Sequence, residues 1–204
     1  MKKNGFTLIE IIAVIVILGV VMTIAVPVVS EQILNSRKSS YISTVKAYTE
    51  TIMGEYEMKN IGSYLYDDEI MLVPIKKIKL EKGVSEESPF GSYLNNYSYV
   101  LIAPENNSYN FYANFLDSAG YGVKMLPLNK LDSEEVKKIS KNDMSNISVY
   151  TSCSLETNKF EISDVIFEYN DKEYIPCEYR ILGNKDSVEC DSNNDLTPVV
   201  LCEK

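Results

Sequence analysis

Residues 11–29 read IIAVIVILGVVMTIAVPVV, and this stretch decides how the whole chain is organised. Thr23 is its only ordinary polar residue, and no comparable run follows Ser30. About 20 apolar residues are enough for a helix to cross the hydrocarbon core of a bilayer. We therefore expect a helix that is buried in lipid or among other apolar helices, with the rest of the chain outside it.

The residues ahead of this run read MKKNGFTLIE, and they argue against a plain anchor or an uncleaved signal. Lys2 and Lys3 predict that this end stays in the cytoplasm. A secretory signal would carry its small-residue cleavage site after the apolar run, but Pro27 occupies a position that should be small. Here Gly5 stands before the run and is followed directly by Phe6.

The segment from Lys2 to Glu10 resembles the prepilin signal of type IV pilins and type II secretion pseudopilins. The resemblance is carried by the basic leader, the Gly5–Phe6 junction, the carboxylate of Glu10 and the unbroken apolar helix, and it extends to about Pro27. It implies that a membrane prepilin peptidase removes residues 1–5 and that the new amine of Phe6 is N-methylated. Beyond Pro27 only the general architecture is similar.

Glu10 is a carboxylate at the edge of a membrane helix. Burying such an acid costs about 2–4 kcal/mol near the centre of the bilayer and less near its interface. Acids in such segments are read as functional by default. In the family, the acid at this place is thought to attract the N-terminal amine of a neighbouring subunit and so to set filament register. The alternative is an interfacial acid that reaches water.

Gly19 and Pro27 bracket the second half of the apolar run, and both weaken helices, by roughly 1 and about 3 kcal/mol. The resemblance implies that the segment between them unwinds when a subunit leaves the membrane and enters the filament. A packing notch at Gly19 and a tolerated kink at Pro27 remain open as the alternative.

After Ser30 the chain becomes amphipathic, because apolar residues recur three, four and seven positions apart and form one stripe of a helix. The stripe comprises Ile33, Leu34, Tyr41, Val45, Tyr48, Ile52 and Tyr56. We predict one helix over residues 6–60, with an apolar part at 6–29 and an amphipathic part at 30–60. Asn60 and Gly62 are stop signals after Lys59.

The remaining sequence predicts a connecting loop at residues 61–88 and a β-rich globular head at 89–204. Alternation of apolar and polar residues predicts an antiparallel meander packed on the stripe of the helix. Asp132 predicts the capped start of a short helix to about residue 141, and residues 170–172 predict a hairpin turn. The meander strands are 97–103, 108–116 and 121–126, and further strands are expected at 147–153, 159–169 and 174–182. The predicted fold class is α+β, a long N-terminal helix on an antiparallel sheet.

All four cysteines lie towards the C-terminus, at Cys153, Cys177, Cys190 and Cys202. An even number in an exported domain favours disulfides. Of the three possible pairings we favour Cys153–Cys177 with Cys190–Cys202, because each closes a local loop. A zinc site is disfavoured, since the sequence has no CxxC spacing and no histidine.

The charge balance argues against nucleic-acid binding, because 29 acidic residues outnumber 20 basic ones. The absence of histidine removes the commonest general base. No phosphate loop, catalytic dyad or nucleophile elbow is visible. Residues 191–195 have the alternating oxygens of a calcium loop but lack its glycine, which favours a solvated turn. We expect no enzymatic activity, metal or cofactor.

The leading hypothesis is a structural subunit of a type IV pilus. It would be stored in the cytoplasmic membrane with its head outside and assembled into a surface filament. The expected partners are other pilin subunits, the prepilin peptidase and the assembly platform in the membrane. The alternatives are a pseudopilin of a secretion or competence system, or a membrane-anchored binding protein with a tyrosine-rich head. An exported enzyme has no support in the sequence.

Overall fold

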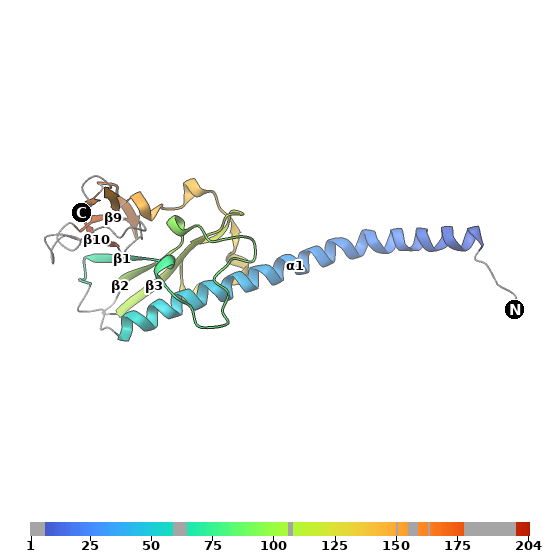
Figure 1. Ribbon diagram of the computed structural model, residues 1–204, viewed down its shortest axis with the longest axis horizontal. Helices are drawn as coiled ribbons and strands as arrows, with labels where there is room; N and C mark the ends of the chain where they lie inside the picture. The colour runs from blue at the N-terminus through green and yellow to red at the C-terminus, as the bar shows by residue number, and fades with distance from the viewer. Residues whose placement is uncertain are drawn as a thin grey trace.

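The computed structural model describes residues 7–58, 65–105, 108–149, 151–154, 159–162, 164–177 and 199–204. A long helix, α1 (Leu8–Met58), projects from a β-rich head like a rod (Figure 1). Its 51 residues span about 77 Å at 1.5 Å per residue. The helix packs against an eight-stranded antiparallel sheet, and this confirms the predicted pilin-like α+β fold.

The two halves of α1 have opposite environments. Large apolar side chains between Leu8 and Val29 are 49–77% exposed, whereas Tyr41 and Ile52 are fully buried. The helix is continuous through Pro27 and reaches Met58, close to the predicted end. Residues 59 and 60, to which the prediction extended, lie outside the described residues. The amphipathic stripe therefore faces the head from Tyr41 onward, whereas Ile33 is 50% exposed. The apolar half is covered by nothing in the described chain.

The main sheet has the strand order β5-β4-β3-β2-β1-β10-β9-β8. Its strands are β1 (Glu69–Pro74), β2 (Tyr99–Glu105), β3 (Ser108–Leu116), β4 (Tyr121–Pro127), β5 (Lys137–Lys138), β8 (Phe167–Tyr169), β9 (Lys172–Pro176) and β10 (Val199–Glu203). A separate pair joins β6 (Thr151–Ser154) to β7 (Lys159–Ile162). The short 3₁₀ turns are η2 (Ile75–Lys77), η3 (Asn95–Tyr97), η4 (Leu128–Lys130), η5 (Ser133–Glu135), η6 (Lys141–Asp143) and η7 (Ile147–Val149). The predicted meander is confirmed as β2, β3 and β4.

The sheet is buried on both faces, which explains a strand that the sequence did not predict. Tyr41 and Tyr48 of α1 pack on one face with Phe111 and Phe115, while Leu72 and Phe167 belong to a cluster on the other. The strand β1 lies in the middle of the sheet, within the segment expected to be a connecting loop. All six of its residues are buried. A strand buried on both faces loses the alternation of apolar and polar residues that identifies most strands.

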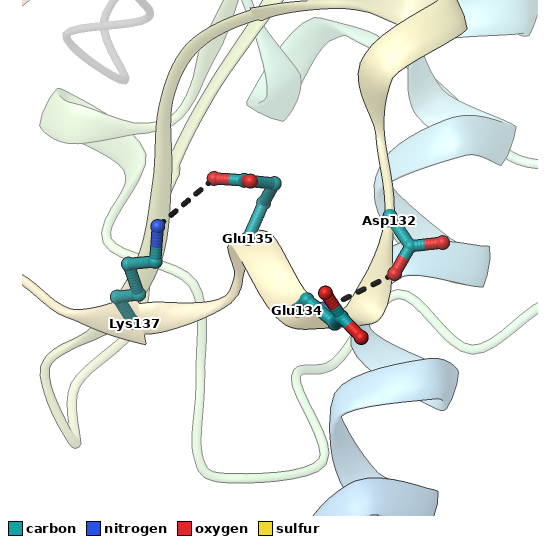
Figure 2. Close-up of polar contacts among 4 residues, drawn as sticks. All are labelled: Asp132, Glu134, Glu135 and Lys137. Atoms are coloured by element: carbon teal, nitrogen blue, oxygen red, sulfur yellow. Dashed lines mark hydrogen bonds and ion pairs between the residues drawn. The ribbon is translucent and has the colours of Figure 1, made fainter.

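The helix predicted after Asp132 is wrong, although its cap is present. The Asp132 carboxylate accepts a hydrogen bond from the backbone N–H of Glu134 at 3.1 Å, but only the 3₁₀ turn η5 follows (Figure 2). This backbone bond holds the pKa of Asp132 below its ordinary value. The chain then enters β5, because Val136 must reach the core, where it is fully buried. The ammonium of Lys137 pairs with Glu135 at 3.1 Å, a spacing of two residues that does not share a helix face (Figure 2).

The C-terminal strand predictions are confirmed only in part. The stretch 147–153 contains η7 and β6, and 159–169 divides into β7 and β8, which belong to different sheets. The hairpin turn between β8 and β9 is confirmed, since Asn170 and Asp171 adopt φ of 51° and 59°, as a primed turn requires. The strand predicted at 174–182 is β9, and its last residues lie outside the described chain.

The preferred disulfide pairing is wrong. Cys177 is bonded to Cys202 with a Cα–Cα distance of 5.2 Å, and each favoured pair required one of these two residues. The reason is sheet order: β9 and β10 are antiparallel neighbours, so the end of β9 lies beside Cys202 despite 25 residues of sequence between the cysteines. The side chain of Cys153, and Cys190 altogether, lie outside the described residues.

Candidate functional site

The exposed end of α1 has a defined polar arrangement that joins Thr7 to Glu10. One carboxylate oxygen of Glu10 accepts hydrogen bonds from the backbone N–H of Thr7 at 2.7 Å and from its hydroxyl at 2.8 Å. In return, the backbone N–H of Glu10 donates to the Thr7 hydroxyl oxygen at 3.4 Å. This reciprocal pattern is a capping box, which satisfies N–H groups that the first helical turn leaves unpaired.

The sequence reading missed the role of Thr7, although its signal was present. A Ser or Thr followed three residues later by Glu, just before an apolar run, is the signature of a capping box. The cap also explains why the helix begins at Leu8. Gly5 and Phe6 lie outside the described residues, on the N-terminal side of this cap.

The apolar half of α1 is the second component of the site. Within the described residues, α1 is the one helix long and apolar enough to cross a membrane, with a mean hydropathy of 3.0 over its most apolar 18 residues. No part of the described head buries these residues. Such a surface must be covered by lipid or by other proteins.

The two helix-weakening residues lie in this half without interrupting it. A Cβ added at Gly19 would meet no atom within 4 Å, so packing inside the chain does not require glycine there. Pro27 lacks an N–H and cannot donate to the Thr23 carbonyl one turn earlier. Two nearby hydroxyls bond other carbonyls of the helix: Thr23 donates to the Val20 carbonyl at 2.7 Å, and Ser30 donates to the Val26 carbonyl at 2.8 Å.

Residues 1–26 match the family described as the Prokaryotic N-terminal methylation motif. The chain is type IV pilin-like. This prepilin-type signal marks the type IV pilin and pseudopilin family, and it implies processing by a prepilin peptidase and assembly into filaments. The match ends before Pro27 and leaves the head unmatched. No characterised protein and no solved structure matches the chain significantly.

The head of this pilin-like chain offers one group of potential metal ligands among the residues that the structure describes. Glu69 lies opposite Cys202 in the pairing of β1 with β10, and its carboxylate lies within 4.8 Å of both cysteine sulfurs. The two sulfurs are bonded to each other, so neither can act as a thiolate ligand. We therefore assign this group to the packing around the disulfide and not to a metal site.

Proposed function

We propose that the chain is a structural subunit of a type IV pilus, which polymerises through α1 into a surface filament. The observation that carries the proposal is the attachment of a prepilin-type signal to a helix whose first half is exposed and, apart from Glu10 and Thr23, apolar. The head folds around the second half alone. The first half is thus free to be buried in lipid and later among copies of itself.

This apolar surface must be covered by lipid or by other proteins. A helix that is apolar all round is stable only in a membrane or inside a protein bundle. Head-to-tail contacts between identical chains give open filaments when the rotation between them does not close. A chain with one such helix and one folded head can reside in the membrane first and enter the filament afterwards.

The residues of the signal take separate roles in this proposal. The leader of residues 1–5 is removed by cleavage between Gly5 and Phe6, and the new amine of Phe6 is methylated. Glu10 sets the register by attracting the amine of a neighbouring subunit. Gly19 and Pro27 let the helix loosen between membrane and filament. The partners are other pilin subunits, the prepilin peptidase and the membrane assembly platform.

The second candidate is a pseudopilin of a secretion or competence system, because the same N-terminal motif marks both groups. The two differ in what the filament does and not in how the chain is processed. Pili extend beyond the cell surface, whereas a secretion pseudopilus drives the export of other proteins.

An experiment in the native host separates the candidates. Antibodies raised against the head are used for immunogold electron microscopy of whole cells and of the sheared surface fraction, with a gene-deletion strain as control. Long labelled filaments that are absent from the deletion strain are the result expected for a pilus. Labelling confined to the envelope, with loss of protein export in the deletion strain, contradicts the pilus assignment and favours the pseudopilin.

A further inference from the structure

A polar stretch of α1 separates the apolar run from the head. It comprises residues 30–40, between Val29 at the end of the run and Tyr41, the first residue of the helix that the head buries completely. This stretch spans about 17 Å at 1.5 Å per residue. The rod leaves the head with no other segment beside it (Figure 1). When the apolar run lies in a membrane, this stretch is therefore the part of the helix at the membrane surface.

Two cations, Arg37 and Lys38, dominate the charge of this stretch. Arg37 is exposed and Lys38 is half-buried, and neither forms an ion pair with a residue that the structure describes. Glu31 is the one acid of the stretch, which leaves it with a net positive charge. The whole chain has a net charge of −9. The sign of the charge is thus reversed between the membrane span and the head.

Both cations lie on the side of the helix that faces the head. They precede the buried Tyr41 by four and three residues, and residues at these spacings are neighbours on one helix face. Helical side chains lean towards the N-terminus, which in this chain is the membrane end. The two side chains are therefore directed into the angle between the rod and the underside of the head.

Distances along the helix place these cations close to the lipid headgroups. The Cα atoms of Arg37 and Lys38 lie about 12 and 14 Å beyond that of Val29 on an ideal helix. Each headgroup layer extends about 5–8 Å beyond the hydrocarbon core. The Cα atoms thus lie roughly 4–9 Å outside the headgroups, and the long side chains can reach back towards them. The gap is comparable to the Debye length of about 8 Å at physiological ionic strength, so salt does not abolish the attraction.

We propose that Arg37 and Lys38 bind the headgroups of anionic phospholipids while the chain resides in the membrane. The inference rests on the membrane-resident state in the proposed function and names the class of lipid that this state selects. The lipid phosphates supply the negative charge that complements the two cations. Binding also offsets the repulsion between an anionic membrane surface and a chain of net charge −9. These contacts are lost when the subunit leaves the membrane for the filament.

The test uses the full chain in phosphatidylcholine vesicles that contain a trace of spin-labelled lipid. Electron paramagnetic resonance measures how much labelled lipid the protein holds, for a phosphatidylglycerol label and for a phosphatidylcholine label. The ratio of the two association constants is the selectivity. Arg37→Gln/Lys38→Gln removes the proposed contact. Lys124→Gln/Lys130→Gln is the matched control, because it removes two exposed cations of the head and changes the net charge equally.

The expected result is a loss of selectivity in one variant only. Each cation near a membrane surface contributes up to roughly fivefold, and screening over the gap reduces this, so Arg37→Gln/Lys38→Gln should lower the selectivity about fourfold. The control variant should stay within about 1.5-fold of the wild type. In 1 M salt the difference should disappear, because the Debye length falls to about 3 Å. Equal selectivity in all three proteins at low salt overturns the proposal.

A failure of the proposed function is recognised separately. If alkaline carbonate strips the chain from the vesicles, the apolar run does not hold it there, and residence in the membrane is rejected together with the lipid site. Firmly inserted chains whose selectivity is unchanged in Arg37→Gln/Lys38→Gln reject the lipid site alone. Loss of filaments from cells that carry this variant, with unchanged selectivity, assigns the two cations to contacts with a neighbouring subunit and also overturns the proposal.

Discussion

The hydroxyl of Tyr41 in α1 donates a hydrogen bond to the backbone carbonyl of Tyr121 in β4, at 3.3 Å and across 80 residues of sequence. Tyr41 is fully buried, and its ring meets that of Tyr93 edge-on with centroids 5.3 Å apart. The contact lies where the rod enters the head. It therefore fixes the direction of the exposed apolar helix relative to the sheet.

Substitutions at Tyr41 should separate the polar bond from the packing. The Tyr121 carbonyl also accepts the backbone N–H of Asp117 at 2.9 Å, so Tyr41→Phe leaves no unsatisfied acceptor and should cost about 0.5–1.5 kcal/mol. Tyr41→Ala empties a core position and should cost about 3–5 kcal/mol. Urea unfolding of the full chain in detergent, followed by circular dichroism, measures both. An alanine variant as stable as the phenylalanine variant would contradict this account of the junction.

The buried tyrosines predict a loss of stability in alkali. Burial, with a smaller effect from the charge of Glu86, raises the pKa of Tyr48 to about 12, and burial raises the pKa of Tyr41 and Tyr93 as well. Because the folded pKa lies above the unfolded value of about 10, this stability is present below about pH 10 and is lost as pH rises through 12.

The titration is followed by phenolate absorbance and circular dichroism on the same sample. We expect part of the tyrosine absorbance to appear only together with unfolding. Tyr48→Phe should remove part of that late absorbance. Complete ionisation of all tyrosines near pH 10, with the fold intact, would rule out this prediction.

The disulfide between Cys177 and Cys202 should contribute substantially to stability. Closing a loop of 25 residues is worth about 3.5 kcal/mol in the chain-entropy treatment. Cys177→Ser and Cys202→Ser should therefore each lower the free energy of unfolding by about that amount, and the double variant should lose no more than either single one. Non-reducing peptide mapping gives the connectivity directly.

A peptide that links Cys177 to Cys153 would show that the observed pairing is wrong. With Cys177 and Cys202 joined, Cys153–Cys190 is the pair left if all four cysteines are oxidised. The same digest should therefore show that link as a second cross-linked peptide.

Reversal of charge at Glu10 should stop assembly without stopping processing. In Glu10→Lys the side chain repels the amine that it is proposed to attract, so filament yield should fall at least tenfold while the leader is still removed. Glu31→Lys is the matched control, because Glu31 is an exposed acid of the same helix beyond the apolar run. The amounts of sheared filament and of cleaved membrane chain give the answer. Normal filaments from Glu10→Lys would remove the register role.

The parts of this molecule that follow a local pattern could be predicted from the sequence. The apolar run predicted the first half of α1, and the alternation in residues 108–116 predicted β3, the middle strand of the meander. The signal was visible in ten residues around Gly5 and Phe6. These features depend on residues that are close together in the sequence, so their patterns can be recognised from one sequence.

The parts that were missed depend on the arrangement of distant segments. β1 reads as EIMLVP and shows no alternation, because α1 covers one face of the sheet and a second core covers the other. The Cys177–Cys202 pair follows from the position of β10 beside β9, which sequence spacing does not indicate. The cap formed by Thr7 is different, because it depends on a four-residue signature, Thr7 to Glu10, that lies in the sequence itself.

Processing at the prepilin-type signal and assembly through α1 can be checked in one measurement, by mass spectrometry of the intact chain and of its N-terminal peptide from filaments sheared from cells. We expect a polymerised chain that begins at Phe6 with a methyl group on its amine. A chain that retains residues 1–5 and occurs only in the membrane fraction would contradict it.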